Sequence, residues 1–414
     1  MRSAAAFVAF AVLVVLAACT QLAAPTLIPT AVASLRVGQS VVFVAAPMPD
    51  GVLWMVDSLP GGNDAIGTIS ASGVYTAPAR VPPGSVVTVT AIDAVRPHRR
   101  VSAEVTVIAP GTLYVYDSVI YVYNDMDTVD GNATPDRSFV LDGIGSDVYD
   151  MTMAPMMDTA FIAFSGWSTT VYRVPDVSTA DGTVTVFTAF DPGGYTEPSG
   201  VAYDPLRDVL YVRYIGGLLA YDVASVAGDD WPASREVSGP SLAGLLGDYD
   251  VRLAIDPAAD RLFLVHPNGT VGVYDDASTI DGEVAPDRTF TVDTPTLAFL
   301  WGAAYDAGRD ELYLGDQRDG EGVYVIAGAA TAEGAVAPSR IIGGPTNPLE
   351  GPSMVSYDAL NDRLVVVLTY GSPDGVAVFD DASTVDGDVA RTRWLRGSEL
   401  PLEYPMGGYL DPTQ

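Results

Sequence analysis

The sequence predicts an all-β protein: a β-sandwich followed by a six-bladed β-propeller that is closed by N- and C-terminal strands. Two observations predict this fold. The first quarter of the chain alternates short β-branched segments with turn residues, and the remainder repeats one pattern six times, about every 50 residues. The 414 residues are 48% apolar, which suffices for packed cores despite a net charge of −31.

Composition restricts the function. The chain has 52 acidic residues, 21 basic residues that are all arginine, and two histidines, His98 and His266. Without lysine there is no P-loop and no Schiff base, and two histidines exclude a His-rich zinc site. A surface with this excess of negative charge repels phosphate backbones, so we expect no nucleic-acid partner.

Residues 1–18 have the form of a secretory signal, because Arg2 precedes an apolar stretch that is too short for a membrane span. The segment Leu16-Ala17-Ala18-Cys19 resembles the lipobox of bacterial lipoproteins. This resemblance implies cleavage before Cys19, lipidation of its thiol, acylation of its amino group by a chain such as palmitate, and a lipid anchor in the cell envelope. In such lipoproteins an aspartate after the cysteine favours the inner membrane, so with Thr20 at that position the resemblance implies the outer membrane or cell surface. A plain secretory signal with a chance cysteine is the alternative.

Residues 19–30 lack periodicity and contain two prolines, so we expect a lipidated tether. Residues 31–108 contain four β segments, at 40–46, 52–56, 86–92 and 101–107, with turn residues between them. Trp54 and the later run GTISASGVYTAP, from Gly67 to Pro78, resemble bacterial Ig-like domains. The resemblance implies an Ig-like β-sandwich with Trp54 in its core, and such domains usually act as spacers.

One pattern recurs through the rest of the chain. The clear copies read VYNDMDTVDGNATPDRSF (122–139), VYDDASTIDGEVAPDRTF (273–290) and VFDDASTVDGDVARTRWL (378–395), and weaker copies lie at 173–190, 220–237 and 325–342. A second signature, such as YDPLRDVLY at 203–211, predicts a strand, a tight turn and another strand. Together the two patterns predict four antiparallel strands per repeat, which is the blade of a β-propeller.

The ends of the repeat region predict closure. GYLDP at 408–412 is a first strand without a second, and LYVY at 113–116 is a second strand without a first. Pairing them completes a sixth blade and removes open sheet edges. Over 111–414 the repeat wording resembles NHL-like and lactonase-like propellers of bacterial envelope proteins. That resemblance implies the fold and no particular activity.

Paired aspartates recur around the first turn of the blades. They are Asp204/Asp208, Asp256/Asp260, Asp306/Asp310 and Asp358/Asp362. Calcium binding and turn capping both use such residues, and repetition in every blade favours capping. A calcium loop at 125–132 is a further alternative, although Val129 stands where an acid is required. We therefore predict no metal and no other cofactor, with calcium as the alternative. Recurrent arginines are predicted to pair with acids of the neighbouring blade.

No nucleophile-elbow or HExxH motif is present, so we predict no catalytic residues. The sequence favours an envelope-anchored lipoprotein that acts as a binding or scaffolding module through a face of its propeller. The ligand would be a glycan or a protein. The alternative is an enzyme, a calcium-dependent propeller hydrolase of the lactonase-like kind.

The expected ligand face consists of the connections that vary between blades, from second to third strands and from one blade to the next. Aromatic and charged side chains there suit a sugar or peptide, although the aromatic residues could equally pack between blades. The candidate ligand-binding residues are Trp167, Tyr195, Glu197, His266, Trp301, Asp316, Arg318, Tyr370, Glu403 and Tyr404.

Overall fold

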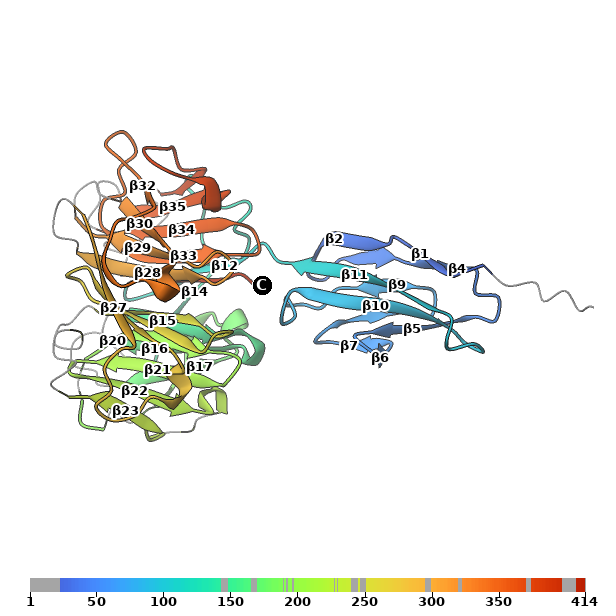
Figure 1. Ribbon diagram of the computed structural model, residues 1–414, viewed down its shortest axis with the longest axis horizontal. Coiled ribbons are helices and arrows are strands. Elements are labelled where there is room, and N and C mark those ends of the chain that lie inside the picture. The colour runs from blue at the N-terminus through green and yellow to red at the C-terminus, as the bar shows by residue number, and fades with distance from the viewer. Residues whose placement is uncertain are drawn as a thin grey trace, which may run out of the picture. The chain divides into compact units, whose positions relative to one another are not determined.

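A computed structural model describes most of the chain. The described residues are 23–142, 148–164, 170–188, 190, 193–195, 197–226, 228, 230–239, 245, 251–294, 299–318, 322–369, 374–396 and 407–413. They form an all-β structure with two compact units, residues 1–78 with 86–106 and residues 79–85 with 107–414 (Figure 1). No helix in this part of the chain is long and apolar enough to cross a membrane. The predicted signal segment and Cys19 lie outside the described residues.

The described strands of the first unit form a five-stranded, a four-stranded and a two-stranded sheet. The five-stranded sheet has the order β2 (Ala31–Arg36), β11 (Arg100–Ile108), β10 (Val86–Asp93), β5 (Val52–Val56) and β6 (Leu59–Pro60). The four-stranded sheet has the order β3 (Ser40–Val42), β9 (Val74–Thr76), β8 (Gly67–Ile69) and β7 (Gly62–Asn63). The two-stranded sheet pairs β1 (Thr26–Ile28) with β4 (Val44–Ala46). Strands β10 and β11 alternate between buried and more exposed residues, as expected when one face of a sheet covers a core. Trp54 is buried in this unit, 8% exposed, against Gly73.

Two sequence predictions for this unit differ from the structure. The segment expected as one strand at 40–46 is divided at Phe43, which is 1% exposed, and its halves join different sheets. The expected tether is too long, because Thr26–Ile28 pairs with β4 and buries Leu27. A strand of three residues beside a proline is too short to show a period of two, so the sequence did not reveal it.

The described residues of the second unit form six sheets. From the first, innermost strand outward they are sheet 1, β37 (Gly407–Asp411), β12 (Thr112–Tyr116), β13 (Ile120–Tyr123) and β14 (Arg137–Leu141); sheet 2, β15 (Val148–Ala154), β16 (Thr159–Phe164), β17 (Val171–Pro175) and β19 (Phe187–Thr188); and sheet 3, β20 (Pro198–Asp204), β21 (Val209–Tyr214), β22 (Gly217–Asp222) and β23 (Arg235–Ser238). The others are sheet 4, β24 (Arg252–Asp256), β25 (Arg261–Val265), β26 (Thr270–Tyr274) and β27 (Arg288–Val292); sheet 5, β28 (Leu300–Asp306), β29 (Glu311–Asp316), β30 (Gly322–Ala327) and β32 (Arg340–Ile342); and sheet 6, β33 (Pro352–Asp358), β34 (Arg363–Leu368), β35 (Gly375–Asp380) and β36 (Arg393–Leu395).

These four strands are antiparallel to their neighbours in every sheet, which is consistent with the blades of a β-propeller. Short 3-10 helices punctuate the connections: η1 (Pro155–Met157), η2 (Val177–Thr179), η3 (Ala224–Val226), η5 (Ala277–Thr279), η6 (Ala329–Thr331) and η7 (Ala382–Thr384).

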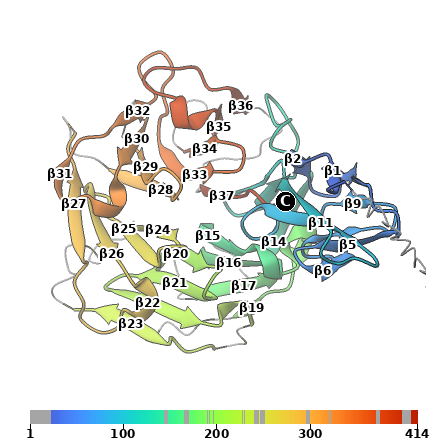
Figure 2. The same cartoon turned by 45° about the vertical axis from the view of Figure 1, so that its right-hand side comes forward.

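The six sheets follow one another around a closed ring, which we call the six-sheet ring (Figure 2). Each innermost strand contacts the innermost strand of the next sheet, and β37 contacts both β33 and β15. Strand β37 pairs with β12, with Leu410 opposite Leu113, as the sequence predicts. An apolar cluster fills each of the six interfaces between neighbouring sheets within the described residues. The hydrophobic core is therefore itself a ring.

The repeated glycine, which follows an acidic residue, ties five of the six neighbouring pairs of sheets together along the outer edge. Gly131 of sheet 1 forms a parallel bridge with Leu395 of sheet 6, and its N–H donates to the Trp394 carbonyl at 2.9 Å. The Asp130 carboxylate accepts the Trp394 N–H at 2.9 Å, which lowers the pKa of Asp130. Equivalent parallel pairings join the neighbouring sheets at Gly182, Gly282, Gly334 and Gly387, in two cases as the short strands β18 (Gly182–Val184) and β31 (Gly334–Val336). Gly131 therefore helps to close the ring where β37 also closes it.

The recurrent arginines differ from their prediction. Arg235, Arg288 and Arg393 form ion pairs with an aspartate at the end of the third strand of their own sheet, not of the neighbouring one. Where the neighbouring sheet is contacted, it supplies backbone carbonyls: Arg340 donates to Ala382 and Val385 at 2.9 and 2.8 Å. The antiparallel register explains the correction, because it brings the fourth strand beside the end of the third.

Candidate functional site

The six-sheet ring has two ends. We call the end that carries the turns between first and second strands the base, and the end where the first strands begin the mouth. The described connections from one sheet to the next lie at the mouth. These two ends separate the repeated aspartates from the variable residues.

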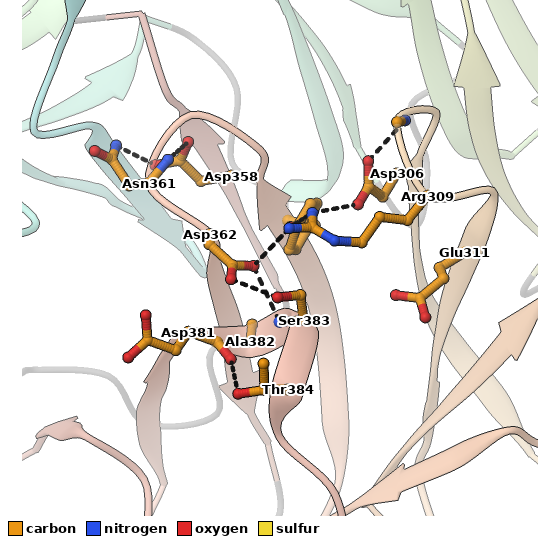
Figure 3. A network of polar contacts seen from close by, with 12 residues as sticks. Asp306, Arg309, Glu311, Asp358, Asn361, Asp362, Asp381, Ala382, Ser383 and Thr384 are labelled. Carbon is orange, nitrogen blue, oxygen red and sulfur yellow. Dashed lines mark hydrogen bonds and ion pairs between the residues drawn. The ribbon is translucent and has the colours of Figure 1, made fainter. Parts of the chain in front are cut away.

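The repeated aspartates cap the turns of the base. The first aspartate of each of the four pairs accepts the N–H two residues further along the chain, as Asp358 does from Leu360 at 3.0 Å, and Asp411 of sheet 1 does the same. The second aspartate accepts an N–H from the 3-10 helix that follows the third strand, as Asp362 does from Ser383 at 3.0 Å (Figure 3). The Asp362 carboxylate also accepts bonds from the Ser383 and Tyr357 hydroxyls, at 2.6 and 2.8 Å. These carboxylates are occupied by turn and helix donors, as capping requires.

The possible calcium loop has similar contacts. Asp125 accepts the Asp127 N–H at 3.1 Å, and Asp127 forms an ion pair with Arg363 at 2.5 Å. The described residues contain no group of three or more acidic, histidine or cysteine side chains arranged to hold a metal ion.

A cavity of about 380 Å³ runs along the inside of the ring. The innermost strands of all six sheets line it, together with Tyr116 of β12. Asp150 and Arg252 are the charged residues among its described lining residues, and both lie toward the mouth. This volume lies in the range of small-molecule sites.

Four innermost strands bulge where they begin at the mouth. Pairing with the second strand skips one residue in each of sheets 2, 3, 5 and 6. The bulged residues are Tyr149, Ser199, Trp301 and Ser353. A bulge removes a residue from the ladder, so that its carbonyl needs another donor.

Arg252 of sheet 4 supplies that donor for three bulges. Its Nε–H donates to the Trp301 carbonyl at 2.9 Å, and Nη1 donates to the carbonyls of Ser199 and Tyr149 at 2.9 and 3.3 Å. The guanidinium lies 4.8 Å from the Tyr149 ring centroid and 5.7 Å from that of Trp301. Arg252 is 5% exposed, so one buried cation joins the first strands of four sheets.

Asp150 lies beside this cation. One carboxylate oxygen is 3.8 Å from Arg252 Nη1 and accepts the Val201 N–H at 2.9 Å. The other accepts the Met151 N–H at 2.9 Å and the Tyr116 hydroxyl at 3.5 Å. Burial raises the pKa of Asp150, against the opposing effects of Arg252 and these N–H donors. Burial also raises the pKa of Tyr116 well above its usual value, so the phenol remains a donor.

Two further features belong to the mouth. Arg213 of β21 is fully buried and donates to the Ser199 hydroxyl at 2.7 Å, so a second guanidinium approaches the same bulge. The indole N–H of Trp301 is buried, and no acceptor for it lies within the described residues. Trp301 itself is 9% exposed and lines the cavity.

Among the predicted ligand residues, Trp301 is the described one that lines the cavity. Asp316 and Arg318 lie together as an ion pair of 3.0 Å, and Asp316 also accepts the Tyr324 hydroxyl at 3.0 Å. His266 caps a turn, because its Nδ1 accepts the Asn268 N–H at 3.1 Å. These contacts hold the connections of the mouth, and a role in ligand binding stays a prediction.

The remaining predicted residues lie farther out or cannot be placed. The Tyr195 hydroxyl donates to Glu236 of the outer strand β23 at 2.6 Å, away from the cavity lining. Glu197 is half-buried and has a left-handed backbone with φ 57°. Four residues lie outside the described part of the chain: Trp167, Tyr370, Glu403 and Tyr404.

Sequence reasoning missed Arg252, Asp150, Tyr149 and Ser199. A signal for two of them was present, because Arg252 and Asp150 occupy the same repeat position, four residues before the end of the first strand. The other sheets carry Gly200, Gly302, Met354 and Gly407 at this position. A charged residue at an otherwise small or apolar position of an innermost strand marks a functional departure from the repeat.

Comparison with known proteins does not identify the chain. No family model matches it, and no curated protein matches it. A chain of the solved structure "Crystal structure of Nidogen/Laminin Complex" is similar over 72% of this chain and 97% of that chain, with a TM-score of 0.48 and 11% sequence identity. A similarity this low assigns neither a family nor a function.

Proposed function

We propose that the six-sheet ring is a six-bladed β-propeller whose mouth binds a ligand, and that the protein acts as a binding or scaffolding module. The observation that carries this proposal is the cluster of Arg252, Asp150 and Trp301 at the mouth. It departs from the repeat, whereas the base keeps the repeat nearly verbatim. An ion pair of the buried Arg252 with the half-buried Asp150 costs desolvation where other sheets have small and apolar residues, so a binding role accounts for it better than stability does.

The proposal predicts that a ligand contacts the mouth. We would apply the labelled full chain to glycan and protein arrays beside two variants, Trp301→Leu at the mouth and Arg207→Gln at the base. We expect Trp301→Leu to weaken the wild-type signals by about 10-fold, since it removes an aromatic surface, and Arg207→Gln to leave them unchanged. Equal loss in both variants, or no signal together with hydrolysis of lactones, would contradict the proposal.

We propose from the sequence that a lipid on Cys19 holds this module in the cell envelope. We also propose that the residues between the lipidated end and the module form an Ig-like spacer. The support is the Leu16–Cys19 segment and the position of the chain's single cysteine. Two or more acyl chains bind a bilayer stably, at about 0.8 kcal/mol for each buried methylene. We expect Cys19→Ser to release the protein from membranes, whereas Thr20→Ser keeps it there. Membrane retention of Cys19→Ser without incorporation of labelled fatty acid would contradict the anchor.

A further inference from the structure

Arg252 has more hydrogen-bond donors than the structure uses. A guanidinium carries five N–H groups. The three on Nε and Nη1 point to the carbonyls of Trp301, Ser199 and Tyr149. The two on Nη2 have no acceptor among the described residues, although Arg252 lines the cavity. A nearly buried cation thus keeps two donors for another molecule.

Charge at the mouth contrasts with charge over the whole chain. The described cavity lining holds one guanidinium, Arg252, and one carboxylate, Asp150, while the chain as a whole carries −31. Arg213 adds a second guanidinium, because it donates to the hydroxyl of Ser199, the residue whose carbonyl accepts from Arg252. Burial also disfavours the charged form of Asp150, since it raises the pKa of this carboxyl group. Around the cavity lining, the guanidinium groups of Arg252 and Arg213 therefore outnumber the carboxylate of Asp150.

The surroundings limit the size and kind of the ligand. A cavity of about 380 Å³ accepts a small molecule rather than a folded partner. Nε and Nη1 of Arg252 are used at the bulges of sheets 2, 3 and 5, so Nη2 is the part of the guanidinium that remains for a ligand. The indole N–H of Trp301 is a further donor without an acceptor in the described part of the site. Unsatisfied donors of this kind favour ligand oxygen atoms.

We propose that the mouth binds a small carboxylate ligand, whose carboxylate oxygen accepts hydrogen bonds from Nη2 of Arg252. The proposal rests on the proposed function and names the ligand class for the same site. Charge-assisted hydrogen bonds of a guanidinium to a carboxylate are stronger than neutral ones, and more so in a site that excludes water. Binding would be short-range, because the net charge of the chain does not attract anions.

The ligand would share the site with Asp150, which makes binding depend on pH. A second carboxylate near Arg252 repels the charged form of Asp150, so binding favours its protonated form. Among the described residues, Tyr116 and Arg252 are the titratable side chains that face Asp150, and burial raises the pKa of Tyr116 well above its usual value. We therefore expect affinity to rise as the pH falls toward the pKa of Asp150, with uptake of a proton on binding.

Calorimetric titration with galacturonate and galactose tests the ligand class. The two sugars share most of their ring and differ by a carboxylate, and acetate serves as the smallest probe. We expect galacturonate to bind at least about 10-fold more tightly than galactose, and more tightly at pH 5 than at pH 7. Equal affinity for the two sugars, or no binding of galacturonate and acetate at either pH, would overturn the proposal.

Matched variants test the residues. Arg252→Gln should reduce the galacturonate affinity by about 10-fold or more, whereas Arg207→Gln at the base, which loses a similar bond to the Pro257 carbonyl, should not. Asp150→Asn should bind more tightly at pH 7 and lose the pH dependence. Thermal unfolding shows whether each variant is folded. If Arg252→Gln does not fold, the Asp150→Asn titration still decides, because an unchanged pH dependence contradicts the proposal.

The array measurement separates this proposal from the proposed function. Array signals that depend on Trp301, without any preference for galacturonate over galactose, would leave the binding module standing and refute the carboxylate site. Absence of both results would refute the two together.

Discussion

At the base of the six-sheet ring, the same aspartates and the same short turns recur from sheet to sheet. At the mouth, the residues that begin the first strands vary between sheets, and Asp150 and Arg252 occupy a position that is glycine or methionine in the other four. At the base, the carboxylates accept hydrogen bonds from backbone N–H groups of the same repeat, as Asp362 does from Ser383. The mouth directs a charge across the ring, from Arg252 to the carbonyls of three other sheets. The difference indicates that the repeat maintains the fold, and it supports the proposal that departures from the repeat create a binding site.

The largest effect is expected from opening the ring. Deleting residues 405–414 removes β37, the innermost strand of sheet 1, with Leu410, which is 5% exposed. Two apolar clusters lose the side chains that β37 contributes to them. Burial of apolar surface contributes about 25 cal/mol per Å², so the lost free energy approaches the net stability of a domain. We expect an insoluble or unfolded chain in solubility and circular-dichroism measurements. A soluble truncated protein with the wild-type melting temperature would contradict closure by β37.

A smaller effect is expected from a single base turn. Asp362→Asn weakens the bonds that Asp362 accepts from Ser383 and Tyr357, so we expect a loss of about 1–2 kcal/mol in the free energy of unfolding. Asp381→Asn is the matched control, because Asp381 is exposed and its side chain makes no cap. Both positions have positive φ, which asparagine tolerates. Urea unfolding measures the free energy of unfolding of both variants. Equal destabilisation would show that the repeated aspartate caps do not stabilise the base.

Acid should protonate Asp150 before it weakens the outer ion pair of Asp275, because the pKa of Asp150 is raised and that of Asp275 is lowered. The hydrogen bond from Arg288 lowers the pKa of Asp275, with a further contribution from Arg261 and against the effect of burial. A carboxyl group with a lowered pKa in the folded state stabilises the fold above its unfolded pKa of about 3.9 and loses that contribution as the pH falls. We expect wild type to be more stable than Asp275→Asn at pH 7, and the gap to close below about pH 4. A gap that widens with acid in urea titrations would contradict this sign.

The smallest effect on stability is expected at Arg318, the partly exposed member of an ion pair of the mouth. Arg318→Gln removes an ion pair with Asp316, but Asp316 keeps the bonds from the Phe299 N–H and the Tyr324 hydroxyl. Arg318 is 31% exposed, so we expect a change of less than about 1 kcal/mol. A loss as large as that of Asp362→Asn would remove the distinction between the two ends of the ring.

Features that repeat were accessible to sequence reasoning, because each copy shows the same local chemistry. The four-strand pattern and the aspartate turns follow from short segments such as YDPLRDVLY, and the pairing of 408–412 with 113–116 follows from the incomplete copies at the two ends of the repeat region. The site depends on non-local geometry. That Arg252 reaches Tyr149, Ser199 and Trp301 depends on β-bulges, which leave no mark in the sequence beyond Gly200 and Gly302. A Cβ at Gly200 would lie 2.7 Å from the Val251 carbonyl oxygen, so this glycine permits the close approach of two innermost strands. In the same way, the partners of Arg235 and Arg288 depend on a register that spacing alone does not give.

The central claim is that the mouth holds a ligand at Arg252, and crystals of the full chain grown with galacturonate at pH 5 test it most directly. The account predicts difference density inside the ring, with a carboxylate oxygen within hydrogen-bond distance of Nη2 of Arg252 and near Trp301. Density for galacturonate at the base or on an outer strand, with the same waters around Arg252 as in crystals grown with galactose, would contradict it.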